Sequence, residues 1–330
     1  MSKKPYKKTK MKISQRELQT AKFAEIADSI IESLECDRIP WNKPYVVNTP
    51  RNAVTGRNYR GANFFILSML HDMGHASASE LNAYVTYAQA KELNTHILKG
   101  SKSLPVTFMK PMIYTKEVTD NKGEIELKER MSFLVKYYNV FPVECLADNS
   151  ILNAVLDPSD FQHDPIENEE RIKSEINSLV DAKELLLQIK NTTPHYAPGR
   201  DYVSMPEKKN FTTAAEYYST FFHELIHMTG HAKRTGRFDS YKEEQKFHTD
   251  KHEYSFEELV AEMGAAMLCS YYGIPSAKTL ENSKAYCQGW AKVLKSNKDM
   301  AYMAASKAQK AVDYLLDIIE TVNKKAALAA

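Results

Sequence analysis

The sequence predicts an α+β protein with two domains, an N-terminal α+β domain and a mostly helical C-terminal domain with a small sheet. The chain has 330 residues, of which 43% are hydrophobic, and this is enough for two cores. Strand-like segments gather in the first half, whereas helical periodicity dominates the second. Residues 1–150 hold 22 basic and 16 acidic residues (net +6), and residues 151–330 hold 22 and 26 (net −4). A polyanion is therefore expected to bind the first half.

Composition also excludes several classes of protein. No apolar run approaches the ~18 residues of a membrane span, so no membrane partner is expected. The six lysines of Met1–Lys12 precede no apolar stretch of a secretory signal, which favours a cytoplasmic location. Four scattered cysteines without a CxxC spacing favour reduced thiols. Any metal must then be held by histidines and carboxylates.

The first half begins with a flexible basic arm over 1–14 and continues as an α+β domain over 15–145. Ser14-x-x-Glu17 is a capping box, and the helix that it starts runs over 15–36 until Pro40 stops the pattern. The later elements alternate short helices with strands and a hairpin turn. We expect a helix at 61–75, strand at 83–87, helix to 93, strands at 104–109, 112–118 and 125–140, and a turn at 120–123.

An acidic stretch without periodicity at 146–170 is the expected linker, and the second domain then covers 171–330. Its apolar residues recur mostly at helical spacing. We expect helices at 171–190, 211–229, 254–272, 278–295 and 298–323. Asp201–Met205 is the one extended segment, and we expect an edge strand that an extended peptide substrate could pair with.

The sharpest motif is His223-Glu224-Leu-Ile-His227, inside an apolar helical run. Positions i and i+4 lie on one face of a helix, so both imidazoles can bind one zinc ion at ~2.0–2.1 Å. Glu224, about 100° around the helix, would serve as general base and acid in a hydrolysis. Five-residue patterns of this kind also arise by chance, with the histidines in a core or on a surface. The apolar setting and a second, carboxylate-rich helix favour the metal site.

That second helix offers the third ligand. Glu258 is the expected ligand, with Glu257, Glu262 or another residue as alternatives, and a carboxylate one turn away would hydrogen-bond a ligating histidine from behind. The acidic residues could instead only favour the start of a helix. The metzincin pattern would need a third histidine where Lys233 stands, so His231 is expected to cap the helix or face substrate, near the ligands.

Basic and aromatic residues alternate in the first half, a mixture that suits single-stranded nucleic acid because cations neutralise phosphates and rings stack on bases. The alternative is a solvated basic face above a core that contains Phe64, Phe65 and Phe108. The basic and aromatic residues are Arg51, Arg57, Tyr59, Arg60, Phe64, Phe65, Lys99, Lys102 and Lys110.

Taken together, the motifs resemble the ArdC-type antirestriction proteins of plasmids, phages and other mobile elements. In the first half the resemblance rests on Pro40-Trp41 with Pro44, Pro50-Arg-Asn52-x-x-Thr55-Gly56-x-x-Tyr59-Arg-Gly61-x-Asn63, Thr86-x-x-Gln89-Ala90 and Lys99-Gly100-x-Lys102. In the second half it rests on Tyr196-x-Pro198-x-x-Asp201-x-Val-x-Met205-Pro206, Tyr217-Tyr218-x-Thr220-x-x-His223-Glu-Leu-x-His227-x-Thr229-Gly230-His231 and Glu257-Glu258-Leu-Val-Ala-Glu262.

The resemblance implies a single-stranded-DNA-binding domain, also found on TraC-type primases, joined to a zincin-type metallopeptidase domain. The implied metal is Zn²⁺, with Mn²⁺ as the alternative, and the implied partners are single-stranded DNA and an unknown protein substrate or host restriction factor. The implied DNA contacts are Arg57, Tyr59, Arg60, Asn63, Lys99 and Lys102. The basic arm and the charged 116–130 hairpin have no counterpart in the resemblance. Two rival hypotheses are a DNA-binding antirestriction module with a structural or vestigial metal site, and an effector metallopeptidase without DNA binding.

Overall fold

The computed structural model describes residues 15–43, 46, 48–72, 81–119, 125–148, 165–190, 193–238, 251–276, 283–296 and 299–329. It has helices and two small sheets, so the predicted α+β class is confirmed. The expected arm over 1–14 and the hairpin turn at 120–123 lie outside the described residues. All four cysteines are free. None of the described helices combines the length and the hydropathy that a membrane crossing requires.

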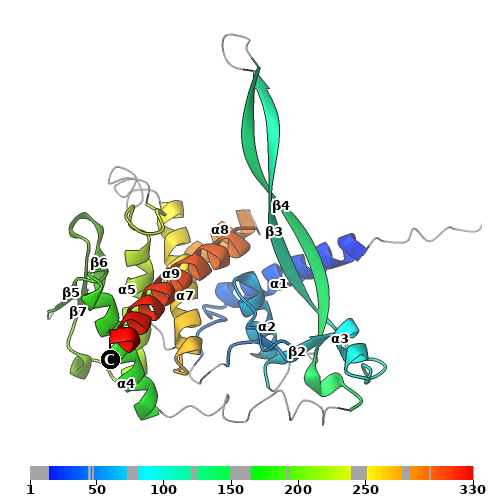
Figure 1. Ribbon diagram of the computed structural model, residues 1–330, viewed down its shortest axis with the longest axis horizontal. Coiled ribbons are helices and arrows are strands. Elements are labelled where there is room, and N and C mark those ends of the chain that lie inside the picture. The colour runs from blue at the N-terminus through cyan, green and yellow to red at the C-terminus, as the bar shows by residue number, and fades with distance from the viewer. Residues whose placement is uncertain are drawn as a thin grey trace, which may run out of the picture.

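The first half folds around a four-stranded sheet of order β1-β2-β4-β3. β1 pairs parallel with β2, and the other pairs are antiparallel. β3 and β4 extend far beyond β2 as a two-stranded ribbon that projects from the body (Figure 1). The elements are α1 (Gln15–Glu35), β1 (Arg51–Asn52), α2 (Ala62–Asp72), β2 (Ala83–Thr86), α3 (Tyr87–Glu92), β3 (Leu104–Thr119), β4 (Ile125–Pro142) and the 3-10 helix η1 (Val143–Cys145).

Two strands of this half are longer than expected, and β4 runs two residues past its predicted end at 140. The segments at 104–109 and 112–118 form the single strand β3, because β3 lies at the edge of the sheet and can accept Pro111, which has no N–H to donate. The strand predicted to reach Tyr87 ends one residue earlier, because the hydroxyl of Thr86 caps the next helix.

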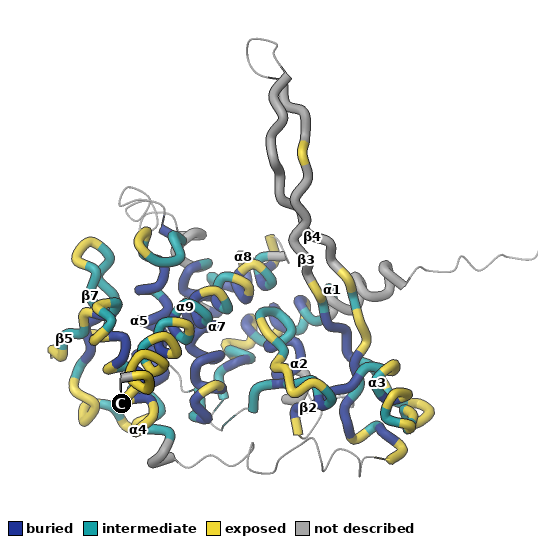
Figure 2. Tube along the Cα trace, viewed as in Figure 1, coloured by how far each residue is buried: buried dark blue, intermediate teal, exposed yellow. Residues whose placement is uncertain are grey.

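The second half consists of helices with a three-stranded sheet of order β5-β7-β6 at one side, next to α5 (Figure 1). Figure 2 shows its central helices α5 and α7 as the most deeply buried part of the chain. The elements are α4 (Pro165–Asp181), β5 (Leu187–Ile189), β6 (His195–Ala197), the 3-10 helix η4 (Pro198–Arg200), β7 (Tyr202–Met205), the 3-10 helix η5 (Lys208–Asn210), α5 (Ala214–Thr229), α7 (Lys251–Tyr271), α8 (Ser283–Ser296) and α9 (Asp299–Ala329).

Three expectations for this half were wrong. The helix predicted over 171–190 ends at Asp181, because Lys183 takes the left-handed conformation (φ 59°) of a Schellman end, for which a glycine is the usual signal. Residues 187–189 are a strand instead. α4 begins at Pro165, inside the expected linker 146–170. β7 is the central strand, flanked by β5 and β6, so it offers no free edge to a peptide.

The two halves share one hydrophobic core. Ile30 and Leu34 of α1 and Phe64 and Phe65 of α2 belong to the same buried cluster as the apolar faces of α7, α8 and α9. Trp41, which follows α1, lies 6.0 Å from Trp290 of α8 between ring centroids. The first sheet keeps separate, smaller cores on its two faces. The N-terminal helices therefore attach the first sheet to the helices that carry the candidate site.

α5 and α7 pack unusually closely at one point. A Cβ added to Gly264 of α7 would lie 2.6 Å from side-chain carbons of Ile226 on α5, so only glycine fits there. The contact joins the last turn of α5 to the interior of α7. It brings the histidine-bearing helix against the carboxylate-bearing helix.

Candidate metal centre

The first two candidate ligands lie on α5. Thr213 begins this helix as its N-cap, in a capping box with Glu216, and the apolar residues that follow bury almost the whole helix. His223 is 4% and Glu224 8% exposed. Polar groups this deeply buried are costly unless they are paired or bind an ion.

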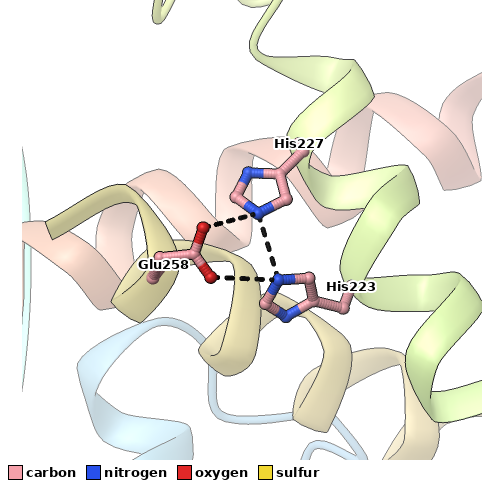
Figure 3. Close-up of side chains that lie close together, drawn as sticks. All are labelled: His223, His227 and Glu258. Atoms are coloured by element: carbon pink, nitrogen blue, oxygen red, sulfur yellow. Dashed lines mark hydrogen bonds and ion pairs between the residues drawn. The ribbon is translucent and has the colours of Figure 1, made fainter. Parts of the chain in front are cut away.

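Glu258 of α7 completes a group of three. Its carboxylate lies 3.4 Å from Nε2 of His223 and 3.5 Å from Nε2 of His227, and the two Nε2 atoms are 3.1 Å apart. Figure 3 shows the three side chains converging from the two helices. Within the described part of the chain, this is the one group of three His, Cys, Asp or Glu residues with ligand atoms close enough to hold a metal.

The spacing fits a metal ion. Ligand atoms placed 2.0–2.1 Å from a tetrahedral zinc ion are about 3.3–3.4 Å apart. The separations of 3.1, 3.4 and 3.5 Å match this value without rearrangement of the helices. Two imidazoles and one carboxylate are also the ligands that catalytic zinc sites use, with one position left for water or substrate.

Two more carboxylates lie behind the imidazoles. Glu262 is 3.2 Å from Nδ1 of His223, and Glu257 is 3.4 Å from Nδ1 of His227. In each ring, Nε2 therefore faces Glu258 and the other histidine, and Nδ1 faces one of the outer carboxylates. Such an outer partner fixes the orientation of the ring and makes the ligating nitrogen more basic.

Arg237, which the sequence analysis did not identify, holds Glu257 in place. Its guanidinium donates to both carboxylate oxygens of Glu257, at 2.7 and 3.1 Å. It also donates to the hydroxyl of Thr229 at 2.8 Å and to the carbonyl oxygen of Ile226 at 2.6 Å. The last two acceptors lie at the end of α5, so Arg237 connects α5 to α7 behind the candidate ligands.

The electrostatics of the group favour a bound cation. Burial lowers the pKa of His223, but the carboxylates of Glu258 and Glu262 outweigh this effect and hold the pKa well above its usual range. Burial is likewise outweighed at His227, chiefly by Glu258, and its pKa rises to about 9. Burial raises the pKa of Glu258, yet the two imidazoles reverse the shift and hold it low. Positive charge is thus stabilised where the three side chains meet.

Glu224 differs from Glu257, Glu258 and Glu262, the three carboxylates next to the imidazoles. Among the residues that the structure describes, it has no hydrogen-bond or ion-pair partner, although only 8% of it is exposed. It follows His223 directly, so it points about 100° away around the helix. A buried carboxylate without a partner is available to accept a proton from a ligand.

His231 lies just beyond the end of α5, outside the group of ligands. Its Nδ1 accepts from the backbone N–H of Lys233 at 3.2 Å. The neighbouring Arg234 connects the end of α5 to the small sheet, because its guanidinium pairs with Asp201 at 2.7 Å and donates to the carbonyl of Met228 at 3.2 Å. Tyr196 donates to the same carboxylate at 2.8 Å, so Tyr196 and Asp201 support the end of the histidine helix.

Three of the six predicted DNA contacts have partners inside the protein. Tyr59 packs half-buried against the first-sheet core, Arg60 pairs with Asp313 of α9, and Asn63 brackets the backbone of Thr107 on β3. The other three, Arg57, Lys99 and Lys102, are exposed. Phe64 and Phe65 are buried as the alternative reading expected, whereas Phe108 is 56% exposed.

A polar network orders the loop that carries Arg57. The carboxamides of Asn52 and Gln89 pair with each other at 3.0 Å in both directions. Asn52 also accepts from the backbone N–H of Thr55 at 3.0 Å, and Gln89 completes the capping box of Thr86. These motif residues therefore position the loop, and their spacing along the chain gave no sign of that role.

Two family models match the chain. The model described as a zincin-like metallopeptidase matches residues 174–307, and the model described as the N-terminal domain of anti-restriction factor ArdC matches residues 21–141. Between them they cover the first sheet, the helices α5 and α7, and all three candidate ligands.

Similar proteins come from plasmids and bacteria. A crystal structure of the antirestriction ArdC protein from plasmid R388, metal-free, is 29% identical with a TM-score of 0.64, covering 91% of this chain and 98% of that one. Its Mn(II)-bound structure gives the same identity and score over 90% and 97%. The DNA primase TraC of Escherichia coli is 26% identical over 88% of this chain, and an uncharacterized protein, y4eC, of Sinorhizobium fredii is 26% identical over 89%. The chain spans 91% of y4eC but only 27% and 19% of the two TraC primases that it matches.

Proposed function

From the premise that the chain is an ArdC-type antirestriction protein, with an ArdC N-terminal domain followed by a zincin-like domain, we propose that it binds single-stranded DNA and cleaves a protein in a metal-dependent reaction. The single observation that carries the catalytic half of the proposal is the convergence of His223, His227 and Glu258. The proposed role is protection of incoming DNA from a host restriction factor.

The proposed chemistry is hydrolysis of a peptide bond. A divalent ion held by His223, His227 and Glu258 would polarise the scissile carbonyl and acidify a water molecule. Glu224 takes the proton of the attacking water as the new C–O bond forms, and then delivers it to the nitrogen of the leaving amine, after which the peptide C–N bond breaks. Glu257 and Glu262 keep the two imidazoles oriented during these steps.

The ligands suit either of two divalent metals. Two imidazole nitrogens and one carboxylate suit Zn²⁺, and imidazole with carboxylate also accepts Mn²⁺, which binds more weakly to such sites. The R388 protein is described in a metal-free and a Mn(II)-bound form, and both match this fold equally well. This supports a metal that serves the reaction rather than one that holds the fold together.

The DNA-binding half of the proposal rests on the N-terminal family and on exposed cations. Arg57, Lys99 and Lys102 are exposed in the first half, which has a net charge of +6. Binding by phosphate neutralisation should weaken steeply with salt, because counterions are released from the DNA. Gel shifts with a single strand and with a duplex across a salt series measure this. A complex with neither form would overturn the DNA-binding half.

Glu224→Gln tests the catalytic half. The variant keeps the shape of the side chain but cannot take up a proton, so metal content should stay at the wild-type level while protection of transferred DNA in a restricting host falls to that of His223→Ala. Elemental analysis and transfer efficiency are the two measurements. Full protection by a metal-loaded Glu224→Gln protein would overturn the peptidase and favour a DNA-binding module with a structural metal.

A further inference from the structure

The projecting ribbon of β3 and β4 has no part in the proposed chemistry. Its strands pair continuously from Leu104 opposite Val140 to Thr119 opposite Ile125. β2 covers only Val140–Pro142 of β4, so the remaining length stands clear of the sheet (Figure 1). A ribbon of this length needs a reason, because two strands alone are marginally stable in water.

The register separates two kinds of residue on the ribbon. Successive residues of a strand belong to opposite faces, and directly paired residues share a face. We define the basic face as the even-numbered positions of 108–118 and 126–136, and the opposite face as the odd-numbered positions of 109–119 and 125–135. The basic face holds Lys110, Lys116, Lys128, Arg130 and Lys136 and one acidic residue, Glu126. The opposite face holds no basic residue and two acidic ones, Glu117 and Glu129.

The pairs on the basic face suit a polyanion. Lys116 is directly opposite Lys128, and like charges in that relation destabilise a strand pair unless an anion neutralises them. Tyr114 is opposite Arg130, and Phe108 is opposite Lys136. Rings beside cations are the combination with which proteins hold unpaired bases and their phosphates.

The inner end of the same face is already covered by protein. Leu104 and Val106 of β3 are buried in the cluster that includes Ile66 and Leu67 of α2. Tyr138 of β4, opposite Val106, is 45% exposed, and Phe108, at the next position outward on this face of β3, is 56% exposed. Lys136 is exposed as well. The surface therefore changes from core to open aromatic and basic residues where α2 ends its contact with the strand.

We propose that the basic face of the ribbon is an arm that holds single-stranded DNA, with its cations on the phosphates and its rings stacked on bases. The inference rests on the proposed function, and adds to it a DNA-binding surface that the predicted contacts do not include. The six pairs from Phe108–Lys136 to Val118–Glu126 span about 34 Å, since strands rise ~3.4 Å per residue. That length matches roughly ten nucleotides of a stacked strand at ~3.4 Å each. The charge difference between the faces favours DNA over a protein partner.

The test compares two triple variants of the full chain with equal charge change. Lys116→Gln/Lys128→Gln/Arg130→Gln removes three cations of the basic face, and Lys310→Gln/Lys324→Gln/Lys325→Gln removes three exposed lysines of α9 as the control. Binding of an oligo(dT) strand is measured across a salt series. The ribbon variant should bind at least ~10-fold more weakly at low salt, and the slope of log affinity against log salt should fall by about 2, because each phosphate contact contributes ~0.7. The control should match wild type.

Phe108→Ala gives a second, independent reading, because an exposed side chain can be removed without harm to the fold. Loss of one stacked base should lower affinity about fivefold or more with no change of slope. If wild type binds oligo(dT) and both ribbon variants match it, the arm is overturned and the proposed function stands. If wild type does not bind, the DNA-binding proposal itself fails.

Discussion

The candidate metal centre and the N-terminal surface are organised in opposite ways. In the metal centre, charged groups face one another inside the protein, and each ring nitrogen has a carboxylate opposite it. On the N-terminal surface, Arg57 is open to solvent, while Arg60 and Asn63 of the same motif are used by the protein itself. The partners of a buried charged residue therefore indicate its role, whereas the surface motif combines a solvent-exposed residue with residues that contact the rest of the protein.

The largest expected effect is loss of the metal from Glu258→Gln. The neutral amide removes one ligand and the charge that opposes both imidazoles, so affinity for Zn²⁺ should fall by more than ~100-fold, beyond the effect of outer partners. Competition with a chromophoric chelator measures it. Glu207→Gln, at a side chain that is 55% exposed, is the matched control. Unchanged affinity for Zn²⁺ would show that Glu258 is not a ligand, and the contrast between the two regions would no longer hold.

The next effect concerns Arg237→Gln, which would leave Glu257 buried without its cation. Breaking a buried pair in this way costs about 3–5 kcal/mol of unfolding free energy. Metal affinity should also fall by ~10–100-fold, because Glu257 orients His227. The double variant Arg237→Gln/Glu257→Gln should recover part of the stability in chemical denaturation. A single variant as stable as wild type would contradict the bridging role of Arg237.

A third prediction separates the two kinds of residue in the N-terminal motif. Asn63→Ala removes a side chain that accepts from Thr107 at 2.9 Å and donates to it at 2.7 Å, so stability should fall by about 1–3 kcal/mol. Arg57→Gln should leave stability unchanged and weaken single-strand binding through the loss of one phosphate contact. Thermal melts and gel shifts of both variants distinguish the outcomes. The reverse pattern would assign Asn63 to DNA.

The smallest effect is at Glu169 of α4, whose carboxylate pairs with Lys173 at 2.7 Å and with Lys208. Hydrogen bonds from Lys173 and Lys208 lower the pKa of Glu169 to about 2. The stabilisation is therefore complete above the unfolded-state pKa near 4.5 and is lost as the pH falls towards 2. Because the pair is partly exposed, Glu169→Gln should cost less than about 1 kcal/mol at neutral pH and only a small part of that at pH 2, where the folded carboxyl is half protonated. Denaturation at both pH values checks this.

The sequence predicted that His223, His227 and Glu258 would lie close together, because their positions are fixed by helix geometry. Two features of the site are local: the spacing of His223 and His227, and the position of Glu258 in an apolar helix. Helix geometry determines which face of the helix each of these side chains lies on. Arg237 could not be found in this way, since its partners on α5 and α7 are reached only through the fold. No regular spacing in the sequence relates Arg237 to Glu257, the carboxylate that it binds.

The errors in the fold have a common cause. Lys183 ends α4 in a conformation that glycine usually takes. β7 was predicted as an edge strand because its neighbours β5 and β6 are too short to leave a periodic signal in the sequence. Tertiary packing, which no local pattern records, decided both. The same reason explains why Arg60 was predicted as a DNA contact although it pairs with the protein itself. Its partner, Asp313, lies 253 residues away on α9.

The shared core also decides how the protein can be divided. α1 and α2 belong to the N-terminal half of the chain, yet they pack with α7, α8 and α9. A fragment cut between the two family models would leave an apolar helix face bare on each piece. Thermal unfolding of the whole chain should accordingly be a single cooperative transition. The two halves should also be inherited as one unit, and 88% of this chain matches one stretch of each of the much longer TraC primases.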